Sequence, residues 1–151
     1  MKDLGFDELR SRLERYCAYQ ERCTHEVSEK IKSFGVVDPS TSKKLTRHLV
    51  ENSFLNEGRF VEAYIEGKVT IKRWGVNKIR NELFKKFVSK EYIDQGVLNI
   101  NRDLYKDNLD GLALKKRASL KKEPSSYVIK NKVLRFLASK GYTLEDCEHL
   151  F

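Results

Sequence analysis

The chain has 151 residues, of which 40% are hydrophobic and 34% are charged, and it carries a formal net charge of +8. A chain of this length is large enough to bury about two thirds of its unfolded surface around one hydrophobic core. The high share of charged residues and the presence of only two prolines favour helices with solvated faces over sheets. We therefore predict an all-α protein.

Membrane insertion, secretion and a disulfide framework are all disfavoured by the sequence. No stretch approaches the ~20 consecutive apolar residues of a membrane helix, and residues 1–6 lack the apolar segment of a secretory signal. The three cysteines, Cys17, Cys23 and Cys147, are not closely paired, so buried free thiols are expected. We expect a cytoplasmic protein, and its charge favours a monomer.

Apolar residues at helical spacing predict three helices in the first third of the chain. The first covers about residues 7–21, and the second begins at residue 23 or 24 and closes at Gly35, which suits a left-handed cap. Asp38, a capping residue before a proline, begins the third helix, which ends near residues 56–58. The core-facing residues expected here are Leu9, Leu13, Tyr16, Cys17, Val27, Ile31, Leu45, Leu49, Val50 and Phe54.

A second group of three helices is predicted from Phe60 onward, with residues 73–75 interrupting it. Asn77 is a candidate cap for its second helix, and Ser89 is one for its third. Phe87 stands where the first group has a glycine, and a left-handed cap costs more for a residue with a Cβ, so we expect that helix to end differently. The expected core-facing residues are Phe60, Val61, Tyr64, Ile65, Ile79, Leu83, Phe84, Phe87, Ile93 and Val97.

The third group opens with a helix over about residues 102–120, followed by a loop at residues 121–126 where a proline and two serines break the helix. A second helix closes at Gly141, and Thr143 caps a last short one. The expected core-facing residues are Leu104, Leu109, Leu112, Leu114, Ile129, Val133, Phe136 and Leu137. The chain is thus expected to hold nine helices in three groups of three.

The second helix of each group repeats one short pattern, in which two apolar residues four apart are followed by a helix stop. The pattern is formed by Val27, Ile31 and Gly35, then by Ile79, Leu83 and Phe87, and then by Val133, Leu137 and Gly141. Successive copies lie 52 and 54 residues apart. Such recurrence predicts tandem units that bury their apolar faces partly against their neighbours. We predict three three-helix repeats, at residues 1–56, 57–100 and 101–151, in an elongated, curved array that offers a long surface.

Positive charge is concentrated in two segments. Residues 68–90 hold eight basic residues against one acidic residue, and residues 115–135 again hold eight against one. The rest of the chain has 14 basic and 20 acidic residues, a net charge of −6. A solvated helix face is the alternative explanation, but this concentration favours a polyanion or an acidic protein groove as partner.

The candidate partner- or DNA-binding residues come from these two segments. They are Lys68, Lys72, Arg73, Trp74, Lys78, Arg80, Lys85, Lys115, Lys116, Arg117, Lys121 and Lys122. Around Gly75, free amides at a helix start and neighbouring cations suit phosphate oxygens or carboxylates. A single aromatic such as Trp74 can stack on a base, although a core-filling role between repeats is the more common use. The second segment extends the same face only if the repeats stack in register.

Catalytic and metal-binding chemistry find little support. The histidines His25, His48 and His149 lie far apart and have no metal-type spacing with the cysteines. A phosphate-binding glycine loop and a nucleophile elbow are both missing from the sequence. We expect a binding protein without a metal, a cofactor or enzymatic activity.

Several motifs resemble those of the RecX family, the small regulators of the RecA recombinase. The most specific is Lys-Arg-Trp-Gly-Val-Asn-Lys-Ile-Arg-Asn-Glu-Leu at residues 72–83. Residues 57–64 resemble the start of the family's second repeat, residues 140–142 its Lys-Gly-aromatic helix ending, and residues 22–27 the beginning of its first repeat. The resemblance covers nearly the whole chain.

The resemblance implies a curved protein of tandem three-helix repeats that binds in the groove of the RecA–single-stranded DNA filament. It implies restraint of ATP hydrolysis and strand exchange, with RecA and single-stranded DNA as partners, the DNA being bound directly or through the filament. An alternative is a helix-turn-helix-like protein that binds DNA directly, with an affinity that falls steeply with salt. A general helical-repeat adaptor is a third, weaker alternative.

Overall fold

Eight α-helices and one short 3₁₀ helix follow one another along residues 4–151, the part of the chain that this computed structural model describes, and this part contains no strand. They are α1 (Phe6–Tyr19), α2 (Thr24–Ser33), α3 (Pro39–Glu51), α4 (Glu57–Thr70), α5 (Val76–Lys85), α6 (Lys90–Leu98), α7 (Arg102–Ser119), α8 (Ser126–Ser139) and η1 (Glu148–Leu150). Residues 1–3, part of the stretch predicted to lack a secretory signal, lie outside the described residues. The all-α prediction is confirmed.

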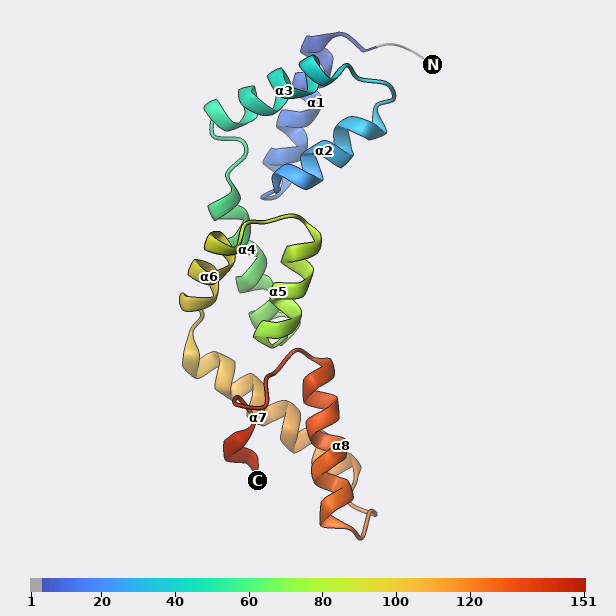
Figure 1. Ribbon diagram of the computed structural model, residues 1–151, viewed down its shortest axis with the longest axis vertical. Helices are drawn as coiled ribbons and strands as arrows, with labels where there is room; N and C mark the ends of the chain where they lie inside the picture. Colours follow the sequence, from blue (N-terminus) through green and yellow to red (C-terminus); the bar gives the residue numbers. More distant parts are fainter. Residues whose placement is uncertain (1–3) are drawn as a thin grey trace.

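The helices form three groups arranged one after another in an elongated molecule (Figure 1). The first group has its own core, in which Leu13 and Leu49 are fully buried. The second and third groups share one continuous core, which also takes in Cys23 from the loop before α2. Burying each such apolar side chain contributes about 1.5–3 kcal/mol, so the shared core holds the second and third groups together.

The three helices that carry the repeated pattern end in the same conformation. Both apolar residues of each copy are buried, with exposed fractions of 4% or less. The next residue of the pattern has a positive φ in every copy, 107° at Gly35, 59° at Phe87 and 101° at Gly141. The prediction that the helix before Phe87 ends differently was therefore wrong. The Phe87 ring lies 4.9 Å from the His25 ring, a tertiary contact that helps offset the backbone strain.

The second helices of the three groups meet end to end. Three consecutive amides at the start of α5 donate to the third group: Gly75 to the Lys140 carbonyl at 2.8 Å, Val76 to the Tyr105 hydroxyl at 3.1 Å and Asn77 to the Gly141 carbonyl at 2.9 Å. The first amides of a helix have no partner within it, so this junction satisfies groups that would otherwise need water. We call it the α8–α5 junction.

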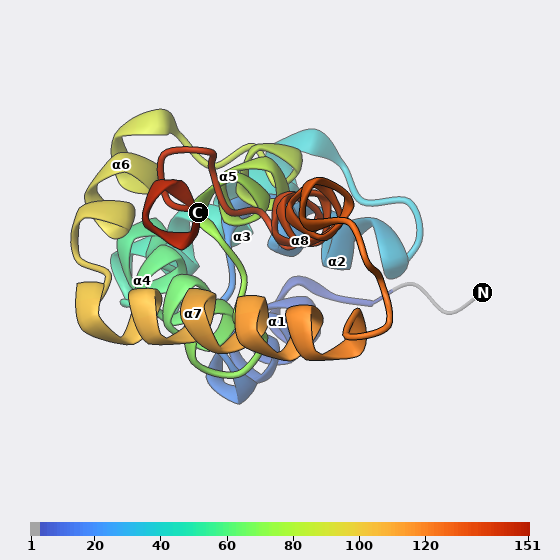
Figure 2. The same ribbon diagram turned by 90° about the horizontal axis from the view of Figure 1, so that it is seen from below.

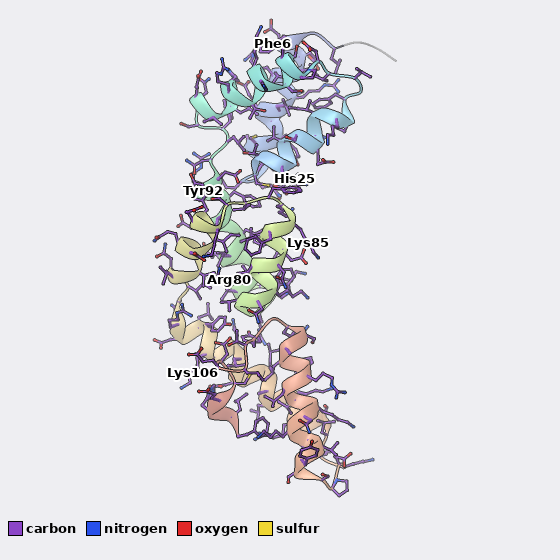
Figure 3. All side chains as sticks on the ribbon, in the orientation of Figure 1. Phe6, His25, Arg80, Lys85, Tyr92 and Lys106 are labelled. Carbon is purple, nitrogen blue, oxygen red and sulfur yellow. The ribbon has the colours of Figure 1, made fainter. Side chains whose placement is uncertain are left out.

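A different contact joins α5 to α2. Phe87 at the end of α5 faces His25 at the start of α2, and Lys86 Nζ lies 3.2 Å from Glu26 Oε2. His25 indeed lies at the boundary between the first and second groups (Figure 3). Helices α2, α5 and α8 therefore form a column along the molecule (Figure 1), and the view from below shows α8 end-on while α7 runs in the plane of the view (Figure 2).

Some predicted core positions and caps are corrected by the structure. Helix α3 ends at Glu51, earlier than predicted. The side chain of Asp38 accepts the Thr41 hydroxyl rather than a helix amide, and Asn77 lies inside α5, whose N-cap is Gly75. The predicted core residues that prove exposed are Val50, Phe84, Phe87 and Leu114. Three of them directly follow a buried residue, and one helical step rotates the side chain by about 100° to the solvent side.

The end of the chain also differs in detail from the prediction. A 3₁₀ helix stands in place of the last α-helix. Thr143 does act as a cap for the turn that follows it, at residues 144–147, because its hydroxyl accepts the Asp146 amide at 3.0 Å. In return, the Asp146 carboxylate accepts the Thr143 amide at 3.0 Å and the Tyr105 hydroxyl at 2.8 Å.

Leu83→Ala should lower the free energy of unfolding by about 2–5 kcal/mol, because Leu83 is fully buried and the change leaves a cavity. Phe84→Ala at the neighbouring position, where 48% of the side chain is exposed, should cost less than about 1 kcal/mol. Urea unfolding of both variants is the measurement. Equal losses of stability in the two variants would mean that α5 does not bury the face that carries Leu83.

Gly75→Ala should weaken the α8–α5 junction, because an added Cβ would lie 2.3 Å from the Gly141 carbonyl carbon. We expect a loss of about 1–3 kcal/mol in urea unfolding, with faster hydrogen exchange at the Asn77 amide. The control is Gly67→Ala inside α4, where no heavy atom lies within 4 Å of the new Cβ, and which should gain about 0.5–1 kcal/mol. Identical behaviour of the two variants would contradict the close contact.

Candidate functional site

The loop between α4 and α5 positions the first set of candidate cations. Arg73 has a φ of 56°, which turns the chain sharply after α4, and its carbonyl accepts the Tyr142 hydroxyl at 2.8 Å. Lys72 and Arg73 are exposed, and neither has a carboxylate within ion-pair distance among residues 4–151. The third group thus fixes the shape of a loop whose cations remain available to a partner.

The start of α5 is not a free anion site. The amides of residues 75–77 were expected to suit phosphate oxygens, but all of them donate to the third group at the α8–α5 junction. Burial raises the pKa of the Tyr105 hydroxyl that accepts the Val76 amide, so this group stays protonated at neutral pH. Any anion bound here must be held by side chains.

Trp74 packs against the shared core and is partly buried. The Nζ atoms of Lys68 and Lys78 lie 4.7 and 4.6 Å from the centroid of its ring, and Lys68 also lies 5.2 Å from the Tyr64 ring. Each cation–π contact of this kind contributes about 0.5–1 kcal/mol at exposed sites. Trp74 therefore fills space and holds two of the candidate lysines in place.

The cations on α5 itself are largely paired within the protein. Arg80 Nη1 lies 2.6 Å from Asp94 Oδ1 on α6, and Lys85 Nζ lies 3.1 Å from Glu82 Oε1. Figure 3 labels Arg80 and Lys85 beside α5. The hydrogen bond from Arg80 lowers the pKa of Asp94, which keeps the pair charged. Because an outside partner would have to compete with Asp94, Arg80 is a weaker binding candidate than Lys72 or Arg73.

The second set of candidates lies on α7 and the α7–α8 turn. Lys115, Lys121 and Lys122 are exposed. Lys116 Nζ lies 5.4 Å from the Phe136 ring, while Arg117 donates to the Leu150 carbonyl at 3.3 Å and lies over the Phe151 ring. Lys121 and Lys122 precede the start of α8, whereas the α4–α5 loop meets its other end. A helix of 14 residues is about 21 Å long, so the structure does not gather the two sets into one cluster.

A cationic surface on the first group was missed by the sequence analysis. We call it the aromatic–cation cluster, and it consists of Arg12, Arg15, Tyr16, Tyr19, Arg22, Lys30 and Phe34, which line a shallow hollow of about 470 Å³. The net charge outside the two basic segments is negative, which hid these residues. Arginine and tyrosine at helical spacing on α1 were the signal that could have revealed them.

Histidines and cysteines serve the fold. His48 Nε2 lies 2.7 Å from Glu14, His149 Nε2 lies 2.6 Å from Asp110, and His25 contacts Phe87. Within residues 4–151 no three His, Cys, Asp or Glu side chains come together as a metal site. None of the helices in this described part is long and apolar enough to cross a membrane.

Comparison with known proteins identifies the family. Models of the second and third three-helix domains of RecX match residues 56–97 and 104–151. The chain belongs to the RecX family. The regulatory protein RecX of Clostridium tetani is 41% identical over 122 residues, which cover 80% of this chain and 55% of that protein. The Clostridium beijerinckii RecX is 35% identical over 121 residues, again covering 80% and 55%.

The chain spans about half the length of the curated relatives it matches. Among solved structures, RecX from Lactobacillus salivarius superposes with a TM-score of 0.84 at 19% identity, covering 95% of this chain and 92% of that one. Another regulatory protein RecX gives a TM-score of 0.85 at 19% identity, with coverages of 95% and 71%. These structures share the fold, and the RecX resemblance inferred from the sequence is confirmed.

The buried thiols should be unreactive in the folded protein. Burial raises the pKa of both Cys17 and Cys23 to about 11 from 9.0. We expect slow reaction with a thiol reagent at about pH 8 and rapid reaction after unfolding in guanidinium, followed by absorbance. Because the folded pKa is the higher one, stability from these thiols is present below pH 9.0 and declines towards about pH 11. Reaction of either thiol at the unfolded rate would contradict its burial.

Proposed function

We propose that this RecX-family chain binds the RecA–single-stranded DNA filament and restrains its ATP hydrolysis and strand exchange. Family membership through two successive RecX domains is the observation that carries the proposal. The relatives are named regulatory proteins, so we propose a binding role without catalysis or a cofactor. The partners would be RecA and single-stranded DNA.

The shape and charge of the chain support this proposal. A column of end-to-end helices gives the molecule a long surface, which suits a groove that runs along a filament (Figure 1). Cations with no ion-pair partner among residues 4–151 lie both in the loop at one end of α8 and in the turn at its other end, namely Lys72, Arg73, Lys121 and Lys122. Cations at both ends of one helix can contact negative charges that lie apart on a filament-bound strand or on RecA.

Changing Lys72, Arg73 and Lys121 together to alanine should weaken inhibition of RecA's single-stranded-DNA-dependent ATPase, because all three are exposed and have no ion-pair partner among residues 4–151. The candidates Lys78, Arg80 and Lys85 are left unchanged, because Lys78 packs on Trp74, Arg80 pairs with Asp94 and Lys85 pairs with Glu82. We expect the concentration for half-inhibition to rise about tenfold, which corresponds to 1.4 kcal/mol. Thermal melting should change little, because exposed charges contribute little to stability.

The matched control removes Lys43, Lys44 and Arg47, three exposed cations on α3. This variant loses the same charge but should inhibit like the unchanged protein. Equal weakening by both triple variants would mean that net charge, and not the cations at the two ends of α8, determines inhibition. If the unchanged protein fails to inhibit RecA at substoichiometric amounts, the proposed function is wrong.

A further inference from the structure

Aromatic rings and cations alternate along the side of the first group between α1 and α2. The Cζ atom of Arg22 lies 3.7 Å from the Tyr16 ring centroid and 5.9 Å from that of Tyr19. Lys30 Nζ lies 5.3 Å from Tyr16 and 5.7 Å from Phe34. Arg12 extends the series, with its Cζ 5.9 Å from Phe34. The order of the stack is Tyr19, Arg22, Tyr16, Lys30, Phe34 and Arg12.

Arg22 is held in position before any ligand arrives. Its Nε donates to the Tyr16 carbonyl at 3.0 Å, and it precedes Cys23, which is fully buried in the shared core. A guanidinium fixed by a ring and a carbonyl loses less conformational entropy on binding than a free one. It still has N–H groups for a ligand, since only its Nε is used in this bond.

The cluster has charges and a ring face that the fold does not use. Arg12 pairs with Glu8 at 3.0 Å, but Arg15, Arg22 and Lys30 have no carboxylate within ion-pair distance in the described part of the chain. The Tyr19 side chain is 82% exposed, so its ring contributes little to the core. Exposed rings next to unpaired cations are what single-stranded nucleic acids require, because bases stack on the rings and phosphates pair with the cations.

The same pairing recurs between the first two helices of the other groups. In the second group Lys68 and Lys78 lie on Trp74, and in the third Lys116 and Lys140 lie 5.4 and 5.7 Å from Phe136. In the first group the series also includes Tyr19, a ring that is 82% exposed and lies next to Arg22. A base can therefore reach an aromatic face beside a cation in this group.

We propose that the aromatic–cation cluster binds single-stranded nucleic acid, with a base stacked on Tyr19 and neighbouring phosphates paired with Arg15, Arg22 and Lys30. An acidic peptide could pair with these cations but would leave the Tyr19 ring unused. The site goes beyond the proposed function, because it requires no recombinase. Its binding should tolerate any sequence, since every base has a face that can stack.

The test is the affinity of the full chain for a fluorescein-labelled oligothymidylate, measured by fluorescence anisotropy without RecA. Tyr19→Ala should weaken binding at least about fivefold, the lower limit for losing one stacked base, whereas Tyr19→Phe should retain it because the ring remains. Arg22→Ala should weaken binding and make the slope of log affinity against log salt shallower by about 0.7, the value for one phosphate of a single strand.

Matched controls separate this site from other surfaces. Tyr92→Ala removes a tyrosine that is 46% exposed on α6, away from the cluster, and should bind DNA normally (Figure 3). Thermal melting of each variant shows that the fold is intact. Equal affinity of Tyr19→Ala and the unchanged chain would overturn the proposal. The proposal would also be overturned if polyglutamate displaced the labelled oligothymidylate as effectively as unlabelled DNA does. If the chain does not bind the oligothymidylate through Tyr19 but still inhibits RecA, only the binding site is wrong and the proposed function stands. If it binds the oligothymidylate through Tyr19 but does not inhibit RecA, only the proposed function is wrong.

Discussion

The α8–α5 junction is the interaction on which the arrangement of the second and third groups depends. Helix α8 ends in a left-handed residue, Gly141, which turns its last carbonyls towards the first amides of α5. Gly75 and Gly141 approach so closely that neither position has room for a Cβ. Three backbone amides that would need water are satisfied between repeats instead of within one. The junction thus links two repeats through backbone groups: carbonyls at the end of α8 accept amides at the start of α5.

The first and second groups are joined mainly by side-chain contacts and not by backbone hydrogen bonds. Here the left-handed residue is Phe87, and its ring meets His25 while Lys86 pairs with Glu26. Glu57 at the start of α4 accepts the Thr24 hydroxyl at 3.0 Å, which ties the beginnings of α2 and α4 together. Because these contacts use side chains, the backbones need not approach closely, and a residue with a Cβ is tolerated at the helix end. The repeats are therefore alike in helix geometry but not in how they are joined.

The sequence predicted the parts of the fold that depend on local pattern and failed where distant residues decide. Apolar spacing located the eight α-helices and most of the buried residues of the described residues 4–151, because periodicity and caps depend on residues that are close in sequence. It could not foresee that Asn108 would be buried, since the amide of Asn108 is satisfied by the Val69 carbonyl at 2.8 Å in another group. It likewise assigned the cap of α5 to Asn77, although the third group supplies the acceptors.

The same distinction explains what could be known of the binding surface. Counting charges along the chain found two basic segments, but pairing takes place in space: Arg80 meets Asp94 on α6, and Lys86 meets Glu26 in another group. Among residues 4–151, Lys72 and Arg73 remain unpaired in the α4–α5 loop, where no helix brings a carboxylate near. In the first group, the negative net charge of all residues outside the two basic segments concealed a cluster of cations between aromatic rings. A cation's availability therefore depends on its neighbours in the fold, and net charge over a segment is a poor measure of it.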